Sequence, residues 1–332
     1  MNTVMKISLF LKKNLLYFTL LSIGIAVIAG NAFPFYKIPK KVYSYWITLL
    51  AILTILPSMI TLRGWELKKV TKMWKEVLLA IVYAYLLSPF IAYLLAFSLP
   101  EAKLRIGYFL SNIVPISSAA LSYVMLARGN VELAAVVLVV LALLSIPLVP
   151  LYLGIYGSMI SVHVPVNKVL FIITVVLFVP FVIGQTIRYI TVKKKHLYYA
   201  EKEMAPYLAI VAMTSLLLLV FSLVARKAPV ILRRPEITAL IWGLQAIAIF
   251  TMIGITLVVD KALKLKYEEH QAVAFVGITK NQSIPAAIAI SSIGGLAVLP
   301  PALIPAIQPV LAVAYLHMEG WVRKFFGGAA GI

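Results

Sequence analysis

The stretch QAVAFVGITKNQSIPAAIAIS, residues 271–291, has the length and apolar ends of a membrane span, but its centre is not compatible with a continuous helix. Five consecutive polar residues occupy that centre: Thr279, Lys280, Asn281, Gln282 and Ser283. A charged side chain at the middle of a bilayer costs about 3 kcal/mol on insertion scales, and the proline that follows removes a backbone donor. Irregular backbone at membrane depth is tolerated only where it is buried in protein or lines a wet cavity. The stretch therefore predicts a discontinuous helix with a binding site at its unwound centre.

The composition is that of an all-α, polytopic membrane protein. The chain has 332 residues, 63% of them hydrophobic, and no cysteine, which excludes disulfides, thiolate metal sites and cysteine nucleophiles. Apolar runs of spanning length recur from end to end. The net charge of +19 would suggest nucleic acid in a soluble protein. Here the Lys and Arg residues lie in short polar breaks, so membrane orientation and contact with the lipid bilayer explain them better, and no nucleic acid is expected.

Hydrophobic windows predict ten spans in a single transmembrane domain, residues 1–332, with short connections and no extramembrane catalytic domain. The spans are 14–33, 43–62, 77–99, 106–126, 131–157, 167–190, 206–225, 237–259, 270–291 and 298–318. If the N-terminus is cytoplasmic, the cytoplasmic segments hold 19 of the 30 Lys and Arg residues and the opposite loops hold 10. This bias predicts a multi-pass protein of the plasma membrane with both termini in the cytoplasm. A signal peptide at the N-terminus is the alternative, but its removal would spoil the symmetry described next.

A second interrupted span occurs in the first half of the chain. Span 106–126 contains Asn112, then Pro115, then Ser117 and Ser118. Pro115 and Pro285 lie 170 residues apart, close to half the chain, and both are expected to mark helix breaks. Five spans per half give the halves, 14–157 and 167–318, opposite topology, so we expect a 5+5 inverted repeat in which spans 4 and 9 are discontinuous. The alternative is a pair of proline-kinked structural helices.

These segments resemble the bile acid:sodium symporter family and the related arsenite efflux carriers of the arsenical-resistance type. The likeness is carried by PISSAALSYVMLARGNVEL (115–133), whose end is similar to the family's YLARGNVAL, and by residues 89–96, Ile106-Gly107, VPFVIG (179–184) and 281–289. The resemblance implies that the broken centres of spans 4 and 9 cross. It also implies a core of spans 77–157 and 237–318, and a panel of spans 14–62 and 167–225 that moves against it.

The departures from that family concern its sodium ligands. The family's glutamate on span 9 falls near Val276, its glutamine near Lys280, and its Ser-Asn pair on span 4 at Ala120-Leu121. Span 5 offers only Ser145. A Na⁺ site needs several oxygen ligands, so we expect the usual sodium sites to be missing. The cysteine that the arsenite carriers place after the span 4 proline corresponds to Ile116, which weakens that assignment without excluding handling of neutral As(OH)₃.

Lys280 is the principal candidate for substrate binding, because it lies about 15 Å of helix from either end of its span and is too deep to snorkel. The alternative is a structural plug that occupies a cation's place. The other candidates can bind substrate or satisfy the loose backbone: Asn281, Gln282, Ser283, Thr279, Asn112, Ser117, Ser118 and Tyr123. Gln245 and Gln308 are expected to bridge helices. The four histidines lie in or near loops without ligand spacing, so no metal site and no cofactor are expected.

These features favour a secondary transporter that moves a small organic anion by alternating access. If transport is coupled to an ion, protons are the alternative to sodium. A uniporter would need no coupling ion. An arsenite or other metalloid efflux carrier is the second interpretation, and an uncoupled channel or receptor is the third. An enzyme is not expected, because no Asp pair, Ser/His dyad or metal cluster lies within the spans. The oligomeric state does not follow from the sequence.

Overall fold

A computed structural model describes residues 3–61, 72–199 and 203–327. In these ranges the chain is helical throughout, and the only extended pairing is an isolated bridge between Ile116 and Lys280. The all-α class is therefore confirmed.

Seven helical segments are long and apolar enough to cross a membrane: α3 (Lys40–Thr61); α4 (Trp74–Val82) with η3 (Tyr83–Leu87) and α5 (Ser88–Ala96); α8 (Val131–Met159); α9 (Val166–Tyr198); α10 (Ala205–Arg233); α11 (Pro235–Ala262); and η6 (Gly295–Val298) with α14 (Leu299–His317). The bent pair α1 (Thr3–Lys13) and α2 (Leu15–Ala32) makes an eighth candidate. The chain is therefore a multi-pass membrane protein. Two shorter helices complete the described chain, η1 (Phe35–Lys37) and α15 (Glu319–Phe325).

The two remaining predicted spans are each divided. Predicted span 106–126 forms α6 (Ala102–Ile113) and α7 (Ala119–Leu126). Predicted span 270–291 forms α12 (Tyr267–Ile278), α13 (Ser283–Ile288) and the π-helical η5 (Ala289–Ile293). None of these pieces is long enough to cross a bilayer alone, so the count of ten stays a prediction.

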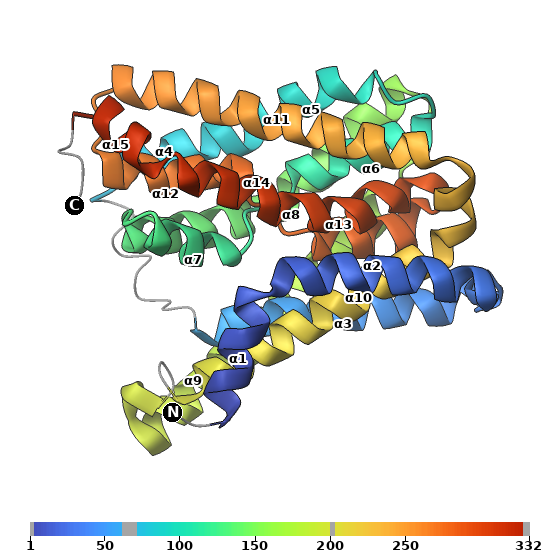
Figure 1. The fold of residues 1–332 in the computed structure, drawn as a ribbon, viewed down its shortest axis with the longest axis horizontal. Coiled ribbons are helices and arrows are strands. Elements are labelled where there is room, and N and C mark those ends of the chain that lie inside the picture. The colour runs from blue at the N-terminus through green and yellow to red at the C-terminus, as the bar shows by residue number, and fades with distance from the viewer. Residues whose placement is uncertain (1–2, 62–71, 200–202, 328–332) are drawn as a thin grey trace.

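The helices pack as two groups. The four-helix group is α2, α3, α9 and α10, in which α10 packs on α2 and α3, and α3 packs on α9. The broken-span group comprises α4 to α8 and α11 to α14, in which α6 packs on α5 and α8, and α11 packs on α12 and α14. Figure 1 shows α2, α3 and α10 running side by side beneath the layer that contains α11, α12 and α14. Contacts of α13 with α3 and α9, and of α10 with α14, join the groups.

Small residues allow close helix contacts, as they commonly do in membranes. A Cβ added at Gly30 of α2 would lie 2.1 Å from the carbonyl oxygen of Ala225 on α10. Large apolar side chains such as Ile28 and Phe171 are 73% and 68% exposed on the outside of the bundle, as expected for surfaces that face lipid. Both termini lie at the same end of the bundle (Figure 1), which we call the terminal end. The α2–α3, α10–α11 and η5–η6 connections lie at the other end, which we call the distal end.

Candidate functional site

The two broken spans meet at their unwound centres. The backbone N–H of Ser117 donates to the carbonyl of Thr279, and the N–H of Asn281 donates to the carbonyl of Pro115. The N···O distance is 3.0 Å in both bonds. These two bonds form the antiparallel bridge in which Ile116 faces Lys280. We call residues 115–117 and 279–281 the crossing. Each unwound segment thus satisfies part of the backbone of the other, which is what irregular chain at membrane depth requires.

Pro115 explains the first break, since proline disfavours helical backbone at the preceding residue and lacks a donor. Helix α6 ends at Ile113, two residues before it. Pro285 plays a different part from the one expected. The second break lies at 279–282, and Pro285 is the third residue of α13, where its missing N–H would have no intrahelical partner in any case. It therefore belongs to the start of the helix after the break. The break itself begins where α12 ends at Ile278.

Lys280 lies at the centre of the crossing, and its side chain is buried. The residue is 1% exposed, and its Nζ has no hydrogen-bond partner within the described part of the chain. Its carbonyl oxygen accepts a bond of 3.0 Å from Nε2 of Gln308 on α14. A buried ammonium without a partner is costly, so its retention needs a reason other than stability.

Two glutamine side chains beside Lys280 each keep a free acceptor. Gln282 donates through Nε2 to the carbonyl of Ser111 over 3.1 Å, and Gln308 donates to Lys280 as described. The Oε1 atoms of both are buried without a partner in the described residues. One buried amine and two buried amide oxygens therefore remain unsatisfied on Lys280 and on two residues that bond to or beside the crossing. A negative group could pair with the first when it is protonated, and hydrogen-bond donors could pair with the other two.

Several predicted site residues are instead occupied within the fold. Asn112 and Gln245 exchange two hydrogen bonds of 3.2 Å, and the Oγ1 of Thr279 bonds to the carbonyl of Phe275. The side chain of Asn281 accepts from the N–H of Ser283 at 3.1 Å, which forms an Asx turn just before α13. These contacts assign mainly structural bonds to Asn112, Thr279 and Asn281.

The crossing is more open on its α7 side. Ser117, Ser118 and Tyr123 are partly exposed, as is Asn281, whereas residues 283–290 are all buried. The ring of Tyr123 stacks on that of Phe275 with centroids 5.6 Å apart. Figure 1 shows that α7 lies toward the terminal end. Ser117, Ser118 and Tyr123, which lie immediately before α7 or within it, are therefore partly exposed on the terminal side, whereas Asn281 lies between α12 and α13.

Four helix ends also converge here. The C-terminal ends of α6 and α12, each of twelve residues, lie at the crossing, and the shorter α7 and α13 begin beside it. The carbonyl end of a helix carries partial negative charge. This field favours a cation at position 280.

Comparison with known protein families identifies a family that matches more than half of the chain. The model of the Sodium Bile acid symporter family matches residues 47–234, a segment that runs from α3 to α10 and contains the first broken span. The chain belongs to this family. No curated protein matches the sequence. The family consists of symporters, so its members transport solutes rather than catalyse reactions.

In this member of the sodium bile acid symporter family, the positions where sodium ligands were expected to be missing carry apolar side chains. Val276 is fully buried, Ala120 is fully buried, and Leu121 is partly buried, so none of the three supplies a ligand oxygen from its side chain. The hydroxyl of Ser145 bonds within its own helix to the carbonyl of Ala142. Among the described residues, no group of three or more His, Asp or Glu could hold a metal ion.

A buried charge network at the terminal end was not predicted. His270, expected in or near a loop, lies in the first turn of α12 next to the turn 263–266, but its side chain is fully buried, which was not expected. Its Nδ1 lies 2.5 Å from Oδ2 of Asp260, and its Nε2 lies 2.9 Å from the hydroxyl of Tyr315. The other carboxylate oxygen of Asp260, Oδ1, accepts from the hydroxyl of Tyr83 at 2.6 Å. The network joins α11, η3, α12 and α14. The sequence feature that could have predicted this network is the short turn 263–266, because it places Asp260 and His270 at similar depth on adjacent helices.

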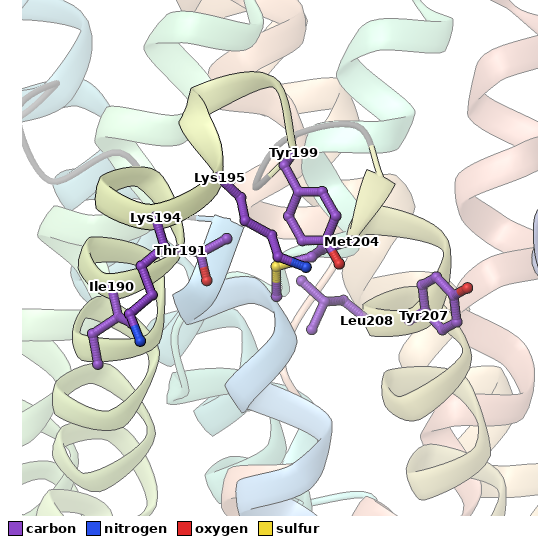
Figure 2. A pocket seen from close by; sticks show the side chains of 8 residues that line it. All are labelled: Ile190, Thr191, Lys194, Lys195, Tyr199, Met204, Tyr207 and Leu208. Carbon is purple, nitrogen blue, oxygen red and sulfur yellow. The ribbon is translucent and has the colours of Figure 1, made fainter.

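The cavities of the described structure lie away from the crossing. One of about 440 Å³ lies between α9 and α10, lined by Ile190, Thr191, Lys194, Lys195, Tyr199, Met204, Tyr207 and Leu208. Figure 2 shows the side chains of Lys195 and Tyr199 close together there, and the Lys195 Nζ lies 4.5 Å from the Tyr199 ring centroid. An apolar cleft of about 70 Å³ lies between α3, α8 and α9. Neither is lined by a residue of the crossing. The 1% exposure of Lys280 shows that its side chain is closed off from solvent in this state.

Proposed function

We propose that the protein is a secondary transporter of a small organic anion and that Lys280 binds the anionic group. The observation that carries this proposal is the buried, unpartnered ammonium at the point where two broken helices cross. In an apolar interior such a charge is expected to be met by a ligand. The free Oε1 atoms of Gln282 and Gln308 would accept hydrogen bonds from donors on the same ligand.

The mechanism we propose is alternating access in a ten-span, 5+5 inverted repeat. In this view α6 with α7, and α12 with α13 and η5, are the fourth and ninth spans. The broken-span group is the core, and the four-helix group is the panel that moves against it. The closed packing around Lys280 supports a mechanism with movement, because a ligand needs relative motion of the groups to reach Nζ. The partial exposure of Ser117 and Ser118 supports access from the terminal end in this state, which we assign to the cytoplasm.

We further propose that transport does not depend on sodium. Among the described residues no carboxylate belongs to the crossing, and the one that is fully buried, Asp260, is bound by His270 and Tyr83 at the terminal end. If Lys280 keeps its proton throughout the cycle, its ammonium supplies one positive charge where a coupling cation would otherwise bind, and the protein is a uniporter. If Lys280 gains and loses a proton during the cycle, the proton is the coupling ion.

The test is flux in proteoliposomes containing the purified chain. Taurocholate, pyruvate, pantothenate and arsenite are offered in turn, with imposed Na⁺ or H⁺ gradients and with choline as the replacement for Na⁺. The proposal expects flux of at least one carboxylate substrate, unchanged in choline, and strongly reduced by Lys280→Met. Flux of arsenite alone would favour the metalloid carrier. Channel-like flux, which does not saturate and shows no counterflow, would contradict alternating access.

A further inference from the structure

A cluster of basic side chains lies at the distal end, away from the crossing. Its members are Lys40 at the start of α3, Lys103 at the start of α6, and Arg226 and Lys227 in the last two turns of α10. We call these four residues the distal basic cluster. They come from both helix groups, since α3 and α10 belong to the four-helix group and α6 to the broken-span group.

Two lysines of the cluster lie against one tight turn. Gly294 and Gly295 have φ values of 75° and 62°, which side chains rarely adopt. A Cβ added at Gly294 would lie 3.3 Å from the Nζ of Lys40, and one added at Gly295 would lie 3.3 Å from the Nζ of Lys103. The absence of side chains on this turn therefore lets the two ammonium groups approach the same stretch of backbone.

The cluster continues onto α10. Lys227 is partly buried and is subject to repulsion from both Arg226 and Lys103. The guanidinium of Arg226 lies 4.2 Å from the ring centroid of Tyr43 and donates through Nη2 to the carbonyl of Ile38. Its Nη1 is buried and has no hydrogen-bond partner within the described chain. One strong, fixed donor of the cluster is therefore unused.

No ion pair between these four side chains and a carboxylate is found among the described residues. Glu101, just before α6, and Glu236, in the first turn of α11, lie at this end, and both form ion pairs with Arg234. Like charges that converge without a counter-ion repel one another, and an anion bound between them removes that repulsion. Arginine and lysine together are the usual ligands of carboxylate, sulfate and phosphate groups.

We propose that the distal basic cluster is a second anion site, which binds a carboxylate, sulfate or phosphate group at the distal end. Helix α13 and η5 separate it from Lys280 by about 15 Å of helix, so the two sites are distinct. A hydrogen bond of 2.5 Å between Ser44 on α3 and Ser291 on η5 holds the helix groups together nearby. Because the four side chains come from both groups, an anion bound here stabilises the state in which the distal end is closed.

The experiment uses the full chain in nanodiscs of phosphatidylcholine, which has no net charge. The Tm is followed by tryptophan fluorescence in sodium sulfate at low millimolar concentration and in sodium chloride of the same ionic strength. Low concentration keeps the general stabilising effect of sulfate small. If the site is specific, the Tm of the wild type should be higher by a few degrees in sulfate than in chloride. This increase should be lost in the double variant Lys103→Gln/Lys227→Gln and retained in Lys103→Arg. Lys168→Gln, which removes one charge at the same end from the first turn of α9, is the matched control and keeps the shift.

Nanodiscs that also contain phosphatidylglycerol distinguish a lipid headgroup from a free anion. Stabilisation by this lipid, lost in the double variant, assigns the site to a lipid phosphate. Stabilisation by sulfate assigns it to a soluble anion. An equal Tm shift in wild type and double variant, or no shift from either source, overturns the proposal. So does loss of the shift in Lys280→Met, which would place the anion at the crossing. The readout needs no transport, so failure of the transport proposal leaves this result unaffected.

Discussion

Replacement of Lys280 by methionine separates the stability of the crossing from its function. The side chain is 1% exposed, and its Nζ has no hydrogen-bond partner. Methionine has a similar length and no charge, so Lys280→Met removes an unsatisfied buried group at little cost in packing. An unsatisfied buried polar group costs about 1–3 kcal/mol, and more when it is charged. We therefore expect the free energy of unfolding of the variant to be higher than that of the wild type by about 1–3 kcal/mol. For a chain of this size the corresponding rise in Tm is about 2–6 °C.

The same substitution should impair transport. Removing one partner of a buried charge pair costs about 2–5 kcal/mol, so the affinity for an anionic substrate should fall at least about 30-fold. Stability is measured by tryptophan fluorescence, which samples both helix groups, because Trp46 bonds to Ser222 and Trp242 to the carbonyl of Leu303. Transport is measured as substrate uptake into proteoliposomes over a range of concentrations.

Two controls accompany this prediction. Lys280→Arg keeps the charge and should retain more transport than Lys280→Met. Lys261→Met removes an exposed lysine and should change neither Tm nor uptake appreciably. A drop in Tm of several degrees in Lys280→Met would refute the reasoning, since it would mean that the ammonium holds the crossing together. Near-normal uptake by the folded variant would remove Lys280 from the mechanism.

Three further predictions concern sodium, the buried network and one glycine. Replacement of Na⁺ by choline at fixed pH and voltage should change substrate uptake less than about twofold, because the crossing lacks a carboxylate ligand. Asp260→Ala should lower the free energy of unfolding by about 3–5 kcal/mol, because it leaves Nδ1 of the buried His270 and the hydroxyl of the buried Tyr83 without a partner. Glu319→Ala, which breaks a partly exposed ion pair, should cost less than about 1 kcal/mol. Gly107→Ala should cost about 1–3 kcal/mol, because the new Cβ would lie 2.3 Å from the carbonyl oxygen of Ala297. Gly243→Ala has open space and should be neutral or stabilising by up to about 1 kcal/mol.

Each of these has a contrary outcome. Uptake that vanishes in choline would show that sodium ligands exist despite the apolar residues at the expected positions. A Tm for Asp260→Ala no lower than that of Glu319→Ala would mean that the buried network adds nothing to stability. Equal Tm values for the two glycine variants would show that α6 and η6 are not in close contact.

Hydropathy and proline placement were enough to predict the membrane class, the edges of most helices and the existence of two interrupted spans. These are local properties: a run of about twenty apolar residues spans a bilayer whatever surrounds it, and Pro115 disfavours helical backbone at the residue before it. The depth of Lys280 follows from the same count along the chain, so its burial could be anticipated before any tertiary contact was known.

The pairing at the crossing depended on the tertiary structure. The two prolines suggested that Pro115 and Pro285 occupy corresponding places, whereas Ile116 pairs with Lys280 and Pro285 lies inside α13. The register of two unwound segments is determined by which backbone groups are left over when four helices are packed, and no local pattern records that.

The charged residues show the same division. The sequence by itself determined that Asp260 and His270 border a short turn and that basic residues occupy the distal loops. Only the tertiary structure decided that the first pair is fully buried against Tyr83 and Tyr315, and that Lys40 and Lys103 meet at one glycine turn. Burial and charge convergence are properties of segments far apart along the chain, and they come into being only when helix packing brings those segments together.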